Sequence, residues 1–122
     1  MLYLRALSLL FAYDVLTRIC RFKTIHQMVR GWPVASRTGN RYSVEDICPA
    51  VDRACVWYPK RALCLQRSFV TTYLLRHNGI AAELVLGAQK MPFKAHAWVE
   101  VEGRAVNERT NVQENYAVWE RC

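Results

Sequence analysis

The sequence is poor in glycine and proline and lacks the long apolar runs of membrane proteins. Its 122 residues include 5 glycines and 4 prolines, too few for a collagen-like repeat or a disordered tether. Arg5, Asp14 and Arg18 interrupt the apolar N-terminal segment before it reaches the roughly 20 residues that span a bilayer. No small-x-small cleavage site follows this segment. We therefore expect neither membrane insertion nor export.

The cysteines lack the spacing of a zinc site or a disulfide framework. Their number, 5, is odd, and they form no C-x-x-C pair. Cys48, Cys55 and Cys64 are too far apart for a zinc knuckle, and no His-x3-5-His pair follows them. We expect no metal and no cofactor. Unpaired thiols fit a reducing compartment, which predicts a cytoplasmic protein.

Positive charge is in excess but is not concentrated. The chain carries 17 Lys and Arg against 10 Asp and Glu, a net charge of +7, yet the basic residues are scattered from Arg5 to Arg121 without a run of five or six. We expect no nucleic-acid partner, and a basic adaptor or nucleic-acid-binding module remains an alternative. With 52% apolar residues, residues 1–122 suffice for a single domain with its own core.

The first two thirds of the chain read as helical. The expected helices are residues 3–30, 43–58 and 62–78. The first lacks internal glycine and proline and stops at Gly31. The second opens at Ser43, whose partner Asp46 three residues later resembles a capping pair. Pro49 should kink this helix and Pro59 should end it, because the residue before a proline leaves the helical region.

The hydrophobic period changes from helical to alternating after Gly79. The expected strands are residues 80–86, 95–101 and 104–108, the last two joined by a turn at Glu102-Gly103. The fold class is therefore α+β, with a helical N-terminal half packed on a small antiparallel sheet. Residues 1–42 form the N-terminal helix and a connection, and residues 43–122 form the core.

Two residues in this pattern could carry nucleophilic chemistry. Cys64 falls in the first turn of the third helix, where unpaired amides and the helix dipole favour a thiolate. His96 lies within an Ala-His-Ala-Trp strand, where small neighbours leave the imidazole accessible as a general base. A buried structural thiol and a packed strand histidine are the alternative interpretations.

The turn at Glu102-Gly103 decides which residue accompanies His96. A type I′ turn needs a positive φ at Glu102, which is costly for a residue with a side chain. A three-residue loop with only Gly103 left-handed avoids this and places Glu108 opposite His96. We favour that register, with Glu108 orienting the imidazole. In the type I′ register Asn107 would take this role instead.

The order of cysteine, histidine and acid resembles papain-like and transglutaminase-like folds. The motifs CLxRS, LLRxxGI, LVLG and PFxAHAWVEVxGxxVN, within residues 57–118, resemble the protease domain of lasso-peptide biosynthesis B2 proteins, the transglutaminase-like leader peptidases. The resemblance implies a cysteine protease that cleaves the leader from a ribosomally synthesised precursor peptide. It implies Cys64 as nucleophile, His96 as proton relay and Glu108 as third residue, where the family normally has aspartate.

Further roles stay open in this comparison. Arg67 and Ser68 match family positions and could either tie the helix to the sheet or contact the substrate. The backbone amide of Cys64 is expected in the oxyanion hole, and Trp57 and Gln66 are candidates for the second donor because they are near Cys64 in sequence.

The resemblance also implies partners. Only helical segments precede Cys64, which predicts a separate leader-recognition protein of the B1 type, together with a lasso cyclase. The apolar N-terminal helix is a candidate docking surface. Within the same fold, glutamine acyl transfer of the transglutaminase type is the alternative enzymatic activity.

Overall fold

The chain folds into four helices followed by a four-stranded antiparallel sheet, so the expected α+β class is confirmed. In a computed structural model, residues 2–20, 22–34, 42–58, 64–90, 93–107 and 116–121 are described. The elements are α1 (Leu2–Ile19), α2 (Phe22–Gly31), α3 (Val44–Trp57), α4 (Cys64–His77), β1 (Ala82–Lys90), β2 (Phe93–Val101), β3 (Arg104–Ala105) and β4 (Ala117–Arg121). The strand order is β3-β2-β1-β4.

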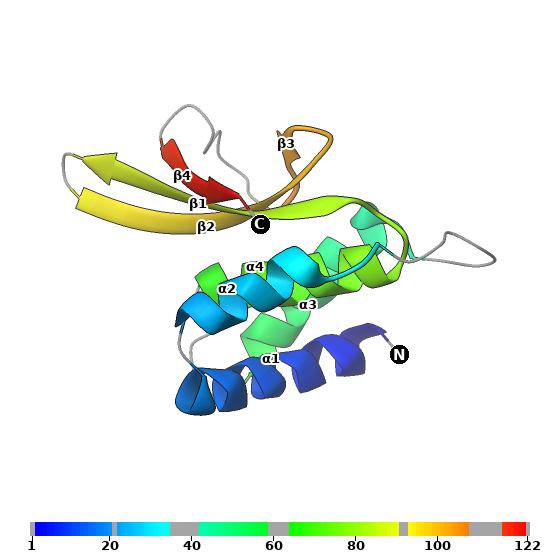
Figure 1. Ribbon diagram of the computed structural model, residues 1–122. Helices are drawn as coiled ribbons and strands as arrows, with labels where there is room; N and C mark the ends of the chain where they lie inside the picture. Colours follow the sequence, from blue (N-terminus) through cyan, green and yellow to red (C-terminus); the bar gives the residue numbers. More distant parts are fainter. Residues whose placement is uncertain are drawn as a thin grey trace.

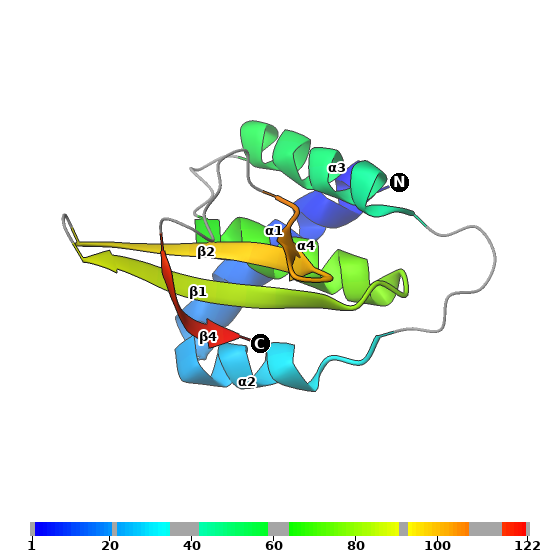
Figure 2. The same cartoon turned by 90° about the horizontal axis from the view of Figure 1, so that it is seen from above.

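The helices cover one face of the sheet (Figure 1). Helix α4 lies beneath β1 and β2, and α1 lies farthest from the sheet (Figure 1). Helices α2 and α3 lie on either side of α4 (Figure 2). The main core fills the space between these layers. Its fully buried members include Leu10, Val51, Val70, Leu74, Leu75, Leu84 and Val99. Because α4 is buried on nearly all sides, its first turn has a fixed position against the sheet.

The single helix expected over residues 3–30 is wrong. The structure breaks it after Ile19 into α1 and α2. An unbroken helix of that length would run about 40 Å, longer than a small domain is wide. The break lets both segments bury apolar side chains, such as Leu10 on α1 and Val29 on α2. The end of the segment at Gly31 is as expected.

Helix α3 has the boundaries that its end signals predict. The Asp46 carboxylate accepts hydrogen bonds from the Ser43 N–H and hydroxyl, both 3.0 Å long, and these bonds lower the pKa of the carboxyl. The helix continues through Pro49 and ends at Trp57. Tyr58 then adopts an extended conformation, φ −68° and ψ 139°, as a residue before proline must.

The favoured register of the β2–β3 hairpin is also wrong. Glu102 and Gly103 both have positive φ, 53° and 79°, which is typical of a type I′ turn. Val101 therefore pairs with Arg104, and Glu100 pairs with Ala105 instead of Arg104. The type I′ turn matches the twist of the flanking strands, and this gain outweighs the cost of about 1–2 kcal/mol for a left-handed residue with a side chain.

Strand β4 was missed, and the returning strand is shorter than expected. β3 ends at Ala105, not at residue 108, and β4 adds to the opposite edge of the sheet by pairing with β1. The segment is only five residues long, too short for its alternation to stand out. In the described part of the chain, no helix has the length and apolarity needed to traverse a bilayer.

Candidate active site at the start of α4

Cys64 is the first residue of α4 and is half-buried. The expectation that it lies in the first turn of this helix is confirmed. The N–H groups of a first turn have no partners within the helix and point toward its N-terminal end. Their partial positive charge favours an anion at this position, so the location suits a thiolate.

The first turns of α4 are hydrogen-bonded to the backbone of β2. In the described part of the chain, β3 pairs with Glu100 and Val101, and the Val106 N–H donates to the Val99 carbonyl. The backbone at Ala97 has partners on α4 instead. The Ser68 hydroxyl donates to the Ala97 carbonyl at 3.2 Å, and the Ala97 amide hydrogen-bonds to the Cys64 sulfur. These bonds fix the sulfur against the strand that carries His96, and they assign Ser68 the helix-to-sheet role.

Asn107 extends this connection. Its Oδ1 accepts the Val99 N–H at 2.9 Å, and its Nδ2 donates to Ser68 Oγ at 3.2 Å. The side chain is buried, and these bonds brace β2 against α4. The structure thus places Asn107 close to the site but engages its amide with a backbone group and a serine.

The thiol pKa of Cys64 is lowered. The largest cause is a hydrogen bond with the His96 side chain, and amide hydrogen bonds from Ala97 and Leu65 act in the same direction, against the opposing effect of partial burial. The other half-buried or buried thiols of α3 behave differently. Burial raises the pKa of Cys48 to about 11 and also raises that of Cys55. Among these three cysteines, Cys64 is the one set up to react as a thiolate.

His96 lies midway along β2 and is half-buried. Its ring is nearly parallel to that of Trp98, with centroids 6.1 Å apart, and tilted relative to that of Tyr116, with centroids 5.5 Å apart. The imidazole therefore has aromatic rings for neighbours and the Cys64 thiol as a hydrogen-bonding partner. This arrangement can transfer a proton between sulfur and imidazole.

The other predicted site residues have different outcomes. Glu108, the favoured third residue, lies outside the described residues. Gln66 is 2% exposed and donates to the Leu10 carbonyl of α1 at 2.9 Å. Residues two apart lie on nearly opposite sides of a helix, so nearness in sequence did not place Gln66 beside Cys64. The side-chain amide of Gln66 is thus bonded to α1, which argues against the prediction that it donates to the oxyanion. Trp57 ends α3 with 69% of its surface exposed.

A second polar cluster connects α1 to the segment before the nucleophile. The Tyr58 hydroxyl donates to the Asp14 carboxylate and contacts the Leu10 carbonyl at 3.3 Å. Burial and the nearby Asp14 raise the pKa of Tyr58 to about 12. Sequence reasoning missed this cluster, because the two residues are 44 positions apart and neither lies in a recognisable motif.

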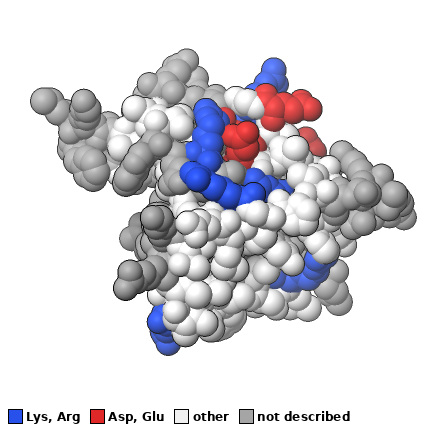
Figure 3. All heavy atoms as spheres, viewed as in Figure 1, with Lys and Arg blue, Asp and Glu red and all other residues white. Residues whose placement is uncertain are grey.

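Charge is distributed unevenly around this framework. On the face seen in Figure 3, the acidic side chains gather over the sheet next to Lys and Arg side chains, whereas the helical layers are mainly uncharged with separate cationic side chains. In α4 itself, Arg67 lies 3.7 Å from Asp52 of α3. Among the described residues, no three His, Cys, Asp or Glu side chains are placed to hold a metal ion.

Comparison with known proteins gives two matches. The model of the transglutaminase-like superfamily matches residues 6–121. The microcin J25-processing protein McjB of Escherichia coli is 36% identical over 55 residues, which are 45% of this chain and 26% of that protein. The chain thus matches about a quarter of the length of this relative. No solved structure matches the chain. The two matches bear out the resemblance found in the sequence motifs.

Proposed function

Because the chain belongs to the transglutaminase-like superfamily, we propose that it is a cysteine peptidase with Cys64 as nucleophile and His96 as general base. McjB is named as a processing protein of microcin J25. From this similarity we take the substrate class, a ribosomally synthesised precursor of the lasso type. The proposed reaction removes the leader from this precursor.

One observation carries the proposal. The Cys64 sulfur lies at the N-terminus of α4 and hydrogen-bonds both to His96 and to the Ala97 amide, which together lower its pKa. A thiolate is the nucleophilic form of cysteine. An inert structural thiol has no need of this environment. In Cys48 and Cys55 burial is the largest cause of the shift, and the thiol pKa is raised. The adaptor alternative, which requires Cys64 to be buried and inert, is therefore less well supported.

The proposed reaction proceeds through a thioester. The Cys64 thiolate attacks the scissile carbonyl, and the peptide C–N bond breaks as the imidazolium of His96 gives its proton to the leaving amine. Water then attacks the thioester while His96 takes its proton, and the thiolate leaves, which releases the new carboxyl group. The backbone amide of Cys64 is free of intrahelical bonding and is a donor for the oxyanion.

We assign the orienting role to Glu108 from its place in the family motif and no longer from the hairpin, because the register that would pair it with His96 is not the one observed. Asn107 is the alternative. A third group would hold the imidazole in the required tautomer and stabilise its charged form. The amide of Asn107 is already bonded to Val99 and Ser68, and this engagement favours Glu108.

The proposal includes a separate leader-recognition protein and a cyclase, in a reducing cytoplasm. Helix α1 offers a docking surface for the recognition protein. Leu4, Phe11, Val15 and Ile19 are 50–73% exposed and fall within roughly 80° around the helix axis. Replacement of Val15 and Ile19 by serine should weaken leader processing but leave the reactivity of Cys64 unchanged, because both side chains are more than half exposed on α1.

The test is mass spectrometry of the reaction products. The purified chain is incubated with a precursor peptide of the lasso type and a leader-recognition protein of the B1 type. We expect a leader and a core whose masses add up to the precursor plus one water. Cys64→Ala and His96→Ala should abolish cleavage, and Cys55→Ala, which removes a thiol of raised pKa, should not.

Other outcomes separate the alternatives. A product lighter by one ammonia, with the peptide chain intact, would indicate glutamine acyl transfer through the same thioester. Cleavage that survives Cys64→Ala would refute the peptidase assignment. Steep salt-dependent binding of RNA or DNA without any reaction would support the adaptor.

A further inference from the structure

A small apolar cluster lies next to His96 on the face of the sheet that points away from the helices. Along β2, His96, Trp98 and Glu100 alternate with residues of the main core, so they share this outer face. Trp98 is completely buried there with Val85, and Ala105 and Tyr116 pack against the pair. The imidazole thus borders a second core.

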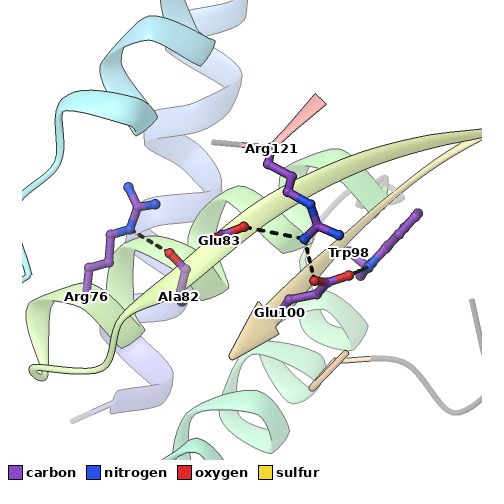
Figure 4. A network of polar contacts seen from close by, with 6 residues as sticks. All are labelled: Arg76, Ala82, Glu83, Trp98, Glu100 and Arg121. Carbon is purple, nitrogen blue, oxygen red and sulfur yellow. Dashed lines mark hydrogen bonds and ion pairs between the residues drawn. The ribbon is translucent and has the colours of Figure 1, made fainter. Parts of the chain in front are cut away.

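Hydrogen bonding fixes the orientation of the Trp98 ring. Its indole N–H donates to Glu100 Oε2 at 2.9 Å. Glu100 is itself only 3% exposed, and its other oxygen lies 2.5 Å from the Arg121 guanidinium of β4, which also pairs with Glu83 at 3.4 Å. Figure 4 shows these four side chains converging from three strands. A buried carboxylate needs such partners, so the indole edge has one preferred position.

Gly87 provides the surface on which this ring lies. It pairs with His96 across β1 and β2. A Cβ atom at Gly87 would come within 2.5 and 2.7 Å of two carbon atoms of the Trp98 six-membered ring, closer than atoms can approach. Only glycine leaves room for the indole here. The ring therefore extends along the sheet toward the imidazole, consistent with the 6.1 Å separation and 26° angle between the two ring planes.

We infer that Trp98, anchored by Glu100 and seated on Gly87, is a positioning residue that keeps the His96 imidazole directed at Cys64. A general base works only within hydrogen-bond reach of its proton, and a half-buried histidine on a strand has several rotamers available. The flat indole face blocks those that turn the ring over the sheet. The importance of Trp98 for catalysis rests on the proposed function. Its effect on the position of the His96 ring can be tested without any peptide substrate.

The first readout is the NMR spectrum of the histidines. The sequence has three, so the ring protons of His96 can be assigned by replacement. The indole ring current should shift these protons upfield in the wild-type protein, and Trp98→Phe should move them toward the positions of an exposed histidine. Trp32→Phe is the matched control, because Trp32 packs on Phe69 and Tyr73 instead.

The second readout is reactivity. We expect Trp98→Phe to slow alkylation of Cys64 by iodoacetamide and, with the precursor as substrate, to lower kcat by about 10- to 100-fold while KM changes little, as misplacement of a catalytic group does. A purely structural role would lower the unfolding midpoint and leave both the alkylation rate and kcat of the folded protein unchanged.

A folded Trp98→Phe variant with unchanged His96 signals and unchanged alkylation would overturn the inference. If this variant does not fold, the same measurements are made on Glu100→Gln. Glutamine keeps the size of the side chain and an acceptor for the indole N–H, but it loses the ion pair with Arg121. It should shift the His96 signals in the same direction by a smaller amount, and unchanged signals would again overturn the inference. Absence of peptide cleavage by the wild-type protein would refute the peptidase, not the positioning role.

Discussion

Replacement of His96 by alanine tests the central contact of the site. It removes the hydrogen bond that contributes most to the lowered pKa of the Cys64 thiol, and it leaves the amides of Ala97 and Leu65 in place. The thiol pKa should therefore rise only part of the way back. The rate of thiolate alkylation should fall at neutral pH, and the pH profile should move to higher pH.

The magnitude follows from the kind of bond that is lost. A hydrogen bond to a charged group contributes about 1.5–3 kcal/mol, which makes the thiolate fraction roughly 10- to 150-fold smaller below the pKa. The thiolate of higher pKa is intrinsically more nucleophilic, with a Brønsted coefficient of about 0.5. The higher nucleophilicity therefore offsets half of the loss in thiolate fraction, counted on a logarithmic scale. The net expectation is roughly 3- to 12-fold slower alkylation.

The assay is alkylation by iodoacetamide at several pH values, with peptide mapping to follow Cys64 alone. Cys48 and Cys55 provide internal references in the same digest, because burial raises their thiol pKa values. His77→Ala is the matched control, since His77 is exposed in the last turn at the other end of α4. An unchanged profile in His96→Ala, or an equal change in His77→Ala, would refute the reasoning.

Three further predictions concern the framework around the site. Glu102→Asn should stabilise the protein by about 0.5–1 kcal/mol, because asparagine tolerates the left-handed first position of a type I′ turn; no gain in urea unfolding would argue against this turn. Asn107→Ala should lower the free energy of unfolding by about 1–3 kcal/mol, because a buried amide and the Ser68 hydroxyl lose a partner; a loss within experimental error would contradict the bracing role. Tyr13 and Tyr58 have pKa values raised to about 12, mainly by burial and also by Asp14, so both are neutral in the fold below pH 10. The contribution of the neutral Tyr13 and Tyr58 side chains to the free energy of unfolding should be complete below pH 10. It should disappear as the pH rises toward 12. Absorbance of tyrosinate should show two late-titrating groups in the folded protein, and Tyr58→Phe should leave one.

Short-range sequence features predicted several helix ends and the two long strands. The capping pair at Ser43, the proline after Tyr58 and the glycine after Asn78 are short-range features, and each ended or began a helix where expected. The change of hydrophobic period after Gly79 predicted β1 and β2 for a similar reason, since one face of each strand must meet the main core.

Other predictions failed where the outcome depends on residues far apart in the chain. After the break at Ile19, α1 packs against α3 and α4, and no pattern within residues 3–30 reveals these contacts. The hairpin register was argued from the conformational cost at Glu102 alone, whereas the twist of the paired strands decided it. Gln66 was chosen by its nearness to Cys64, but helical geometry turns it toward Leu10.

The sequence by itself determined which side chains could perform the chemistry: a cysteine that starts a helix and a histidine within a strand, each recognisable from its immediate neighbours. Only the tertiary structure decided how they meet. The bonds from Ser68 and Asn107 to β2, and the Trp98 ring over Gly87, involve strands and helices distant in sequence. Side-chain hydrogen bonds and close packing act over a few ångströms in space, and a sequence pattern reports only distance along the chain.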